Sequence, residues 1–401
     1  MLKYWVWLAE LPGLKSSQRL ALLRHFGSPE DVFFADREEL LLAEGVSPAQ
    51  AELDHDLSAA DRILADCQRL GQRIMTIQDA EYPQRLRNIF DPPLTLYVRG
   101  RMPAIDEEAA IAVVGTRDCT PYGIAAAERI SQELAASGAV VVTGLAKGVD
   151  SAAARGALRA GGTVVGVVGN GLDVYYPWES KDLYEDVAAA GVLISEYPPG
   201  SEPEKHHFPA RNRIMSGLGA ATLVVEAPER SGALITARLA LEQGREVYAV
   251  PGPIGAPASV GCNRLIRDGA GLAAEGWDIL RDFQERFPEK LHPAGDLPAW
   301  TPLPTRRRAE PRRRPEPESE PEPKEEPKPA LRAVSPQGLT DDQIALLRVL
   351  EPETPIQVDD LIERTGVPAR RVSSALTMLE IDGCVAQHDG KRYTRTVELS
   401  E

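Results

Sequence analysis

A cluster of cationic side chains surrounds one aromatic residue between positions 205 and 217, where the sequence reads KHHFPARNRIMSG. Lys205, Arg211 and Arg213 could hold phosphate groups, and Phe208 could stack on a nucleic-acid base. An exposed aromatic ring among cations is the arrangement that a single-stranded nucleic acid requires. The alternative is a core phenylalanine with unrelated surface charges around it, and composition alone leaves both readings open.

Further candidates for phosphate binding share one context, because each follows within a few residues of a short apolar run. Glycines at such positions let the backbone approach a ligand closely. Ser231 and Gly232 precede an expected helix and resemble an anion-binding nest. The candidates outside the 205–217 cluster are Gly115, Thr116, Arg117, Lys147, Asn170, Ser231 and Gly232, and Asn212 is a further candidate within it.

No catalytic residue, metal site or cofactor site is predicted. The adjacent His206 and His207 would rarely share one metal ion, and no third ligand is evident beside them. The loop after residues 111–115 does not read G-x-G-x-x-G, so a dinucleotide fingerprint is absent. The 4 cysteines are far apart and form no C-x-x-C pair, which supports neither a disulfide framework nor a zinc site.

These candidates must be positioned by an α/β framework. Apolar runs of strand length alternate with Ala-rich helical stretches, which indicates a parallel sheet covered on both faces. We therefore predict a Rossmann-like, doubly wound domain, whose ligands bind beyond the carboxyl ends of the strands. The predicted strands are residues 111–115, 139–144, 163–169, 192–197, 221–227 and 246–252.

Pro209 is expected to begin a helix, which would place Phe208 before the helix and not on its apolar face. Arg211 and Arg213 would then lie near the amino end of that helix, where the helix dipole does not favour cations. Their presence there is better explained by an anionic ligand, or by a carboxylate such as Glu196 or Glu226.

The remaining chain divides into appendages and a linker. Residues 1–75 resemble a helical SAM or helix-hairpin-helix unit, and residues 76–300 form the extended Rossmann-like domain, in which residues 76–110 are an irregular lead-in. Residues 301–337 are first Arg-rich and then Pro/Glu-rich, as expected of a disordered linker. Residues 338–401 read as three helices and a hairpin, the pattern of a winged-helix domain.

The charge balance restricts where a nucleic acid could bind. The net charge is −15 and the isoelectric point is about 5.1, which counts against a protein that coats DNA through its overall charge. A nucleic-acid site must then be a local cationic patch. From residue 338 onward, seven Lys/Arg face twelve Asp/Glu, which favours a protein-contact or regulatory role for that domain. No apolar run reaches membrane-spanning length and the amino terminus is unlike a signal peptide, so we expect a cytoplasmic protein.

Six motifs in order resemble the DNA-processing protein A (DprA/Smf) family. They include VGTR (114–117), TGLAKGVD (143–150), FPARNRIMSGL (208–218) and VEAPERSGALITA (225–237). The resemblance implies a non-enzymatic protein that binds incoming single-stranded DNA in natural transformation, protects it from nucleases and loads the RecA recombinase. It also implies homodimers formed through the Rossmann-like domain.

The resemblance assigns DNA contacts to Arg117, Lys205 and Phe208. Two positions depart from the family pattern. Thr116 stands where the family commonly has serine, which keeps the hydroxyl, and Ala233 stands where a second serine is frequent, which removes one.

The alternative function is a nucleotide-binding Rossmann protein related to the phosphoribohydrolases. Those enzymes carry a P-G-G-x-G-T-x-x-E loop with a catalytic glutamate. The corresponding stretch here is PERSGALIT (228–236), in which Thr236 stands about where the glutamate would be. General acid–base catalysis at that position would lack its carboxylate. A nucleotide-sensing regulator without DNA binding is a third reading.

Overall fold

The computed structural model describes residues 1–295, 332–335, 339–352, 354–388 and 392–399. The chain divides into two compact units, Met1–Arg306 and Arg307–Glu401, and each is described by itself. Most of the predicted linker, residues 301–337, lies outside the described residues.

Unit one is built on a mixed sheet whose central strands are parallel. All six predicted strands are present, and with the flanking strands the order is β1-β2-β6-β5-β4-β3-β7-β8-β9. The order reverses between β3 and β7, so the loops that follow these two strands diverge and open a crevice at the carboxyl edge. The predicted strands are β3 (Ala110–Val114), β4 (Val140–Thr143), β5 (Val164–Val168), β6 (Val192–Ser195), β7 (Ala221–Val224) and β8 (Glu246–Ala249).

Residues 76–110 are more regular than predicted. Strand β2 (Thr95–Gly100) pairs antiparallel with β6, and β1 (Arg73–Thr76) pairs antiparallel with β2. Leu96, Tyr97 and Val98 are all buried, so β2 is packed on both faces. The expected irregular lead-in was therefore wrong for β2. On the far edge, β9 (Gly271–Leu272) extends the sheet beside β8.

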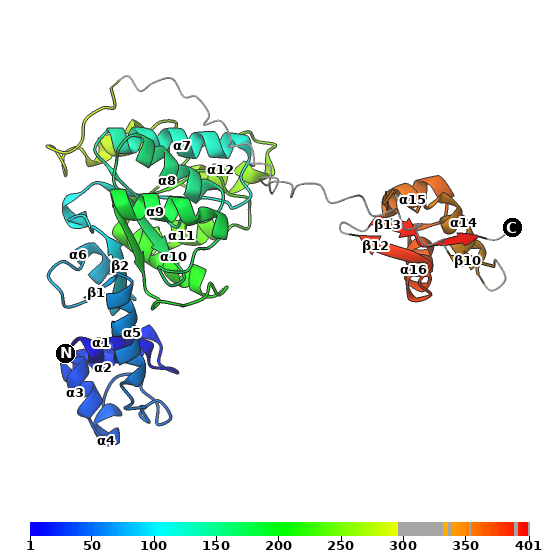
Figure 1. Cartoon of the computed structure of the whole chain (residues 1–401). Coiled ribbons are helices and arrows are strands. Elements are labelled where there is room, and N and C mark those ends of the chain that lie inside the picture. Colours follow the sequence, from blue (N-terminus) through cyan, green and yellow to red (C-terminus); the bar gives the residue numbers. More distant parts are fainter. Residues whose placement is uncertain (296–331, 336–338, 353, 389–391, 400–401) are drawn as a thin grey trace, which may run out of the picture. The chain divides into compact units, whose positions relative to one another are not determined.

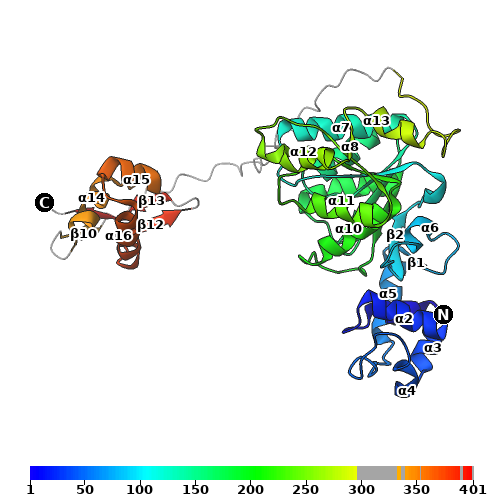
Figure 2. The ribbon, with the colours of Figure 1, turned by 180° about the vertical axis from the view of Figure 1, so that it is seen from behind.

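Helices cover both faces of this sheet, as Figures 1 and 2 show from opposite sides. Side chains alternate along the strands: Ile111 and Val113 pack toward one helical layer, and Ala112 and Val114 toward the other. The first layer holds α7 (Pro121–Ala136), α8 (Val149–Arg159), α9 (Lys181–Ala190) and α13 (Trp277–Leu280). The second holds α6 (Gln84–Arg87), α10 (His207–Leu218), α11 (Gly232–Glu242) and α12 (Val260–Arg267).

The amino-terminal helices gather beyond the β1–β2 edge of the sheet (Figure 1). They enclose their own apolar cluster around Trp5, Trp7 and Leu22, and Leu94 at the start of β2 joins that cluster. These helices therefore pack as part of unit one. They are α1 (Leu2–Glu10), α2 (Ser16–Phe26), α3 (Pro29–Phe34), α4 (Arg37–Leu40) and α5 (Ser58–Arg69).

Unit two has the predicted winged-helix fold. Its three helices enclose a core that includes Leu346, Leu361 and Leu376. One strand lies within the expected linker: β10 (Arg332–Val334) pairs in parallel with β14 (Val397–Leu399). The other elements are α14 (Asp341–Val349), α15 (Val358–Thr365), α16 (Ala369–Ile381), β11 (Ile356–Gln357), β12 (Val385–His388) and β13 (Arg392–Arg395). Within the described ranges of both units, no helix combines the length and apolarity that a bilayer span demands.

Candidate nucleic-acid interface

A cavity of about 410 Å³ opens at the carboxyl edge of the sheet, where the loops after β3 and β7 diverge. The amino-terminal end of α10 forms a third wall. The sheet topology therefore brings the predicted loops together as expected. Eight predicted site residues line the cavity: Gly115, Thr116, Arg117, Phe208, Arg211, Asn212, Ser231 and Gly232.

Phe208 and Arg117 form the mouth of this cavity. The Arg117 guanidinium carbon lies 4.6 Å from the centre of the Phe208 ring, and Arg117 is exposed. Tyr176 continues the aromatic surface, with its ring centre 5.5 Å from that of Phe208. The prediction that Phe208 precedes the helix was wrong, because α10 begins at His207. Phe208 nevertheless stays half-buried and outside the apolar core, because its side chain lines the cavity.

Hydrogen bonds of the backbone and of the Glu226 side chain hold the loop after β3 against the loop after β7. Thr120 caps α7, and the buried Glu226 carboxylate accepts hydrogen bonds from the Thr120 amide at 2.8 Å and from its hydroxyl at 2.7 Å. The Thr116 amide donates to the Glu226 carbonyl at 2.8 Å. A side chain at Gly115 would put a Cβ 2.4 Å from Val149 Cγ2, so this close approach requires glycine. These contacts therefore join the two loops that form the cavity rim.

Arg211 lies beneath the cavity and is only 4% exposed. Its Nη1 donates to the Val167 carbonyl at 2.6 Å, and the absence of a side chain at Gly144 makes room for the guanidinium. Burial lowers the pKa of Arg211, and the nearby Asp150 carboxylate opposes that shift. Because the guanidinium is committed to the protein interior, Arg211 supports the cavity floor and is not placed as the predicted surface phosphate contact.

Asp150 is the buried carboxylate facing Arg211. Burial raises its pKa to about 6, while Arg211 and the backbone amides of Gly115 and Ala146 act in the opposite direction. These amides belong to the loops after β3 and β4, so Asp150 ties two loops of the rim together. This is the structural role expected for a carboxylate in the first turn of α8.

Arg213 is also turned away from the cavity. Its Nη1 and Nη2 donate to the two oxygens of Glu196 at 2.8 and 2.7 Å, and its Nε contacts Asp91 Oδ2 at 3.2 Å. The side chain is 10% exposed. Of the two explanations offered for this cation, the structure selects the Glu196 carboxylate over an anionic ligand. Glu226, the other carboxylate considered, binds Thr120 instead.

Three other predicted residues lie outside the cavity lining. Asn170 is 1% exposed, and its amide donates to the carbonyls of Gly171 and Val174, so it shapes its own loop. Lys147 and Lys205 are exposed, and neither has an ion-pair partner among the described residues. They remain available to a ligand that extends beyond the cavity.

The loop before α11 supplies one cation that the sequence reasoning missed. Arg230 lines the cavity and is exposed, directly before Ser231. Ser231 is the N-cap of α11: its hydroxyl oxygen accepts a hydrogen bond from the Ala233 amide at 3.3 Å, and Gly232 is the first helical residue. The signal that could have identified Arg230 was its place directly beside the predicted anion-binding turn.

A third potential metal ligand lies beside the two histidines, although none was evident in the sequence. Potential ligand atoms of Glu204, His206 and His207 lie within 4.8 Å of one another. His207 is otherwise accounted for: its Nδ1 lies 3.0 Å from the Gly169 carbonyl oxygen, and its ring stacks on Tyr197 with centres 3.7 Å apart. Glu204 pairs with His206 at 3.3 Å. These contacts hold the segment before Phe208 in place.

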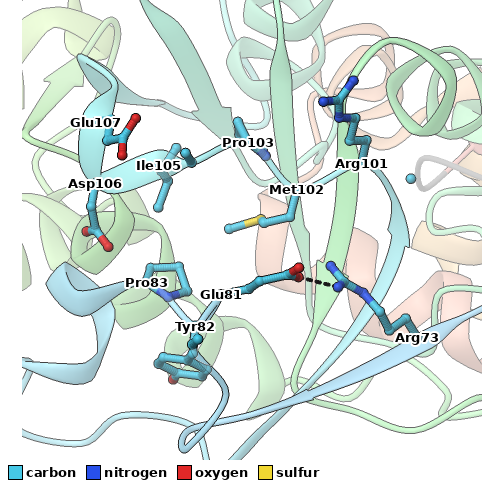
Figure 3. A pocket seen from close by; sticks show the side chains of 13 residues that line it. Arg73, Glu81, Tyr82, Pro83, Arg101, Met102, Pro103, Ile105, Asp106 and Glu107 are labelled. Carbon is cyan, nitrogen blue, oxygen red and sulfur yellow. Dashed lines mark hydrogen bonds and ion pairs between the residues drawn. The ribbon is translucent and has the colours of Figure 1, made fainter.

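A separate hollow of about 670 Å³ lies at the opposite, amino edge of the sheet (Figure 3). None of the predicted site residues lines it. It is lined by Arg73, Glu81 and Arg101, among others, and Arg73 pairs with Glu81. The Arg101 amide binds the carbonyl of Gly191, which directly precedes β6. This hollow therefore faces away from the loops that the topology presents for ligand binding.

The fold and the cavity define a Rossmann-like protein with a winged-helix appendage, and comparison with known proteins gives its family. Residues 73–284 match the family model of DNA recombination-mediator protein A, and residues 314–391 match the DprA winged helix domain. The chain belongs to this family, the DprA/Smf family of DNA-processing proteins.

Individual relatives agree with this assignment. Protein Smf of Synechocystis sp. is 33% identical over 98% of this chain and 98% of its own length. DNA processing protein DprA of Streptococcus pneumoniae is 44% identical over 52% of this chain and 73% of its own. The X-ray structure of DNA processing protein A from that species superposes with a TM-score of 0.61 at 36% identity, covering 70% of this chain and 98% of that chain.

Proposed function

We propose that this protein binds single-stranded DNA at the carboxyl edge of its Rossmann-like sheet. One base stacks on Phe208, while Arg117, Arg230 and Lys205 hold the flanking phosphates. The observation that carries the proposal is the Arg117 guanidinium 4.6 Å from the Phe208 ring at the mouth of a cavity. A ring flanked by cations stacks any base and is accessible only where bases are unpaired.

The charges around this ring fit a polyanion. Arg117, Lys205 and Arg230 are exposed, and none has an ion-pair partner in the described part of the chain. By contrast, the buried Arg213 is fully paired with carboxylates. Unpaired cations at the cavity and on the segment before α10 give an acidic molecule the local patch that a focused DNA site needs.

We further propose that the bound strand is DNA taken up during natural transformation, which the protein protects from nucleases and delivers to RecA. In this proposal the protein acts in the cytoplasm, as a homodimer formed through the Rossmann-like domain, and without catalysing a reaction. Membership of the DNA-processing family supports this role. Stacking on Phe208 would hold the DNA extended, a form suited to transfer onto a recombinase.

Replacement of Phe208 tests the stacking contact. Because base stacking contributes about 1–3 kcal/mol per base, Phe208→Ala should weaken binding of a labelled single strand roughly tenfold or more at constant salt. Phe208→Trp should retain most of the affinity. Phe34→Ala is the matched control, because Phe34 is 70% exposed and lies on α3. An unchanged affinity in a folded Phe208→Ala protein would overturn the proposal.

The rival function is nucleotide hydrolysis in the same cavity. Its strongest support is Asp150, a cavity-lining carboxylate whose burial raises its pKa to about 6. Asp150 is however engaged by loop amides and by Arg211, and the position of the expected catalytic glutamate holds Thr236, which is 1% exposed. Release of free base from AMP, lost in Asp150→Asn, would favour the enzyme. We expect no release.

A further inference from the structure

Arg117 separates two cavities. The first is the cavity lined by Phe208. The second, of about 680 Å³, lies on the side of Arg117 that faces away from α11, and it is bounded by the start of α7, one face of α8 and the short helix η2 (Trp178–Ser180). Arg117 and Asp118 line both cavities. A ligand that passes over Arg117 therefore leaves the first cavity and enters the second.

Cations of α8 and the loop before it face this second cavity. Lys147 and Arg155 line it together with Arg117, and all three side chains are exposed. Among the residues with described positions, none of the three has an ion-pair partner. The carboxylates of Asp118 and Glu179 also line the cavity, so its charge is only weakly positive and favours a single phosphate group.

The position of Lys147 is fixed by the backbone around it. The Ser151 hydroxyl donates to the Ala146 carbonyl at 2.6 Å, and the Val149 amide donates to the Thr116 carbonyl at 3.3 Å. The lysine is therefore carried on a turn tied both to α8 and to the loop that carries Arg117. Arg155 lies on the next turn of α8, on the same face as Ser151.

An aromatic surface connects the two cavities. The Tyr176 ring lies 5.5 Å from Phe208 and is tilted by 39° against it, and Tyr176 is 38% exposed. Pro177, the next residue, lines the second cavity. Apolar surface suited to a base thus runs from Phe208 through Tyr176 to the edge of the second cavity, with unpaired cations beside it.

We infer that the second cavity binds a further nucleotide of the same single strand, with Lys147 and Arg155 holding its phosphate and Tyr176 supporting its base. This inference rests on the proposed function and extends it: the strand follows a track from Arg230 over Phe208 and Arg117 to Arg155. The binding site then spans more nucleotides than the first cavity alone can hold.

The dependence of affinity on strand length tests this track. Labelled oligothymidylates from about 4 to about 16 nucleotides are titrated in the full-length protein by fluorescence anisotropy at several salt concentrations. Arg155→Ala should leave the affinity for the shortest strand unchanged and lower the affinity for the longest roughly threefold to tenfold. The slope of log affinity against log salt concentration for the longest strand should become shallower by about 0.7. Arg155→Lys should restore the slope. Arg101→Ala is the matched control, because that exposed arginine lines the hollow at the opposite edge (Figure 3).

The outcomes separate this inference from the proposed function. If Phe208→Ala weakens binding while Arg155→Ala changes no strand length, the second cavity is not part of the track. If Arg155→Ala weakens binding of the shortest strand as much as binding of the longest, the inference is also overturned, because the cavity then holds no additional nucleotide. If dTMP displaces the longest strand when both supply the same concentration of phosphate groups, the second cavity is a site for free nucleotides and the inference is overturned. If Phe208→Ala leaves every length unchanged, the proposed function itself fails.

Discussion

Two arginines separated by one residue on α10 illustrate how burial divides structural from ligand-binding cations. Arg211 donates to the Val167 carbonyl beneath the cavity, and Arg213 is held by Glu196 and Asp91. Arg117, in contrast, is exposed, and its guanidinium lies over the ring of Phe208. The two arginines that follow Phe208 on α10 thus support the site, whereas Arg117, from another loop, lies exposed beside the ring.

Arg213→Ala should therefore act on stability. Removing one partner of a buried ion pair leaves the Glu196 carboxylate without its cation, which costs about 3 kcal/mol in the free energy of unfolding. Urea denaturation measures this loss. Arg230→Ala is the comparison, because it removes an exposed cation and should reduce DNA affinity with little change in stability. Wild-type stability in Arg213→Ala would contradict its structural role.

Within unit one, the contact between the amino-terminal helices and the sheet contains a half-buried acid. Glu10 ends α1, and the hydroxyl of Tyr97 on β2 donates to it at 3.4 Å. Burial raises the Glu10 pKa to about 7, although Arg19 on α2 and the Tyr97 hydroxyl oppose the shift, and Glu196 after β6 adds to it. The folded protein therefore retains a proton on Glu10 that the unfolded chain releases at lower pH.

Stability should depend on pH through this residue. Because the folded-state pKa lies above the ordinary value of 4.5, the contribution of Glu10 is fully present below about pH 4.5 and is lost as the pH rises through about 7. Glu10→Gln, which stays neutral, should gain stability relative to wild type as the pH rises from about 5 to about 8. Thermal unfolding of both proteins across this range is the measurement. Parallel stability profiles would show that Glu10 is not buried as described.

The sequence predicted the elements better than it predicted what their side chains contact. Near-continuous apolar runs such as residues 163–169, which alternate with helical stretches, are typical of buried parallel strands, so the sheet and its ligand-binding edge were predicted from pattern alone. Strand β2 was missed because its segment, residues 95–100, is surrounded by Pro and charged residues that resemble a loop. The burial of Arg211 and Arg213 depends on partners far along the chain, Val167 and Asp91, which local pattern does not reveal.

The molecule as a whole is strongly acidic, and the proposed DNA site is a small cationic track on it. The net charge of −15 repels a polyanion at long range, so affinity must come from the few unpaired cations around Phe208 and from stacking. Double-stranded DNA offers the same phosphates but no accessible base face. Preference for single strands is therefore the property that follows most directly from the arrangement of Arg117, Phe208 and Arg230.

The most direct test of the central claim is a salt titration of binding to single-stranded and double-stranded oligonucleotides of one sequence, for wild type and Arg117→Ala. We predict tighter binding of the single strand at every salt concentration, and a salt slope for Arg117→Ala that is shallower by about 0.7 for each lost phosphate contact. Equal affinity for both forms of DNA, together with an unchanged slope in Arg117→Ala, would contradict the claim.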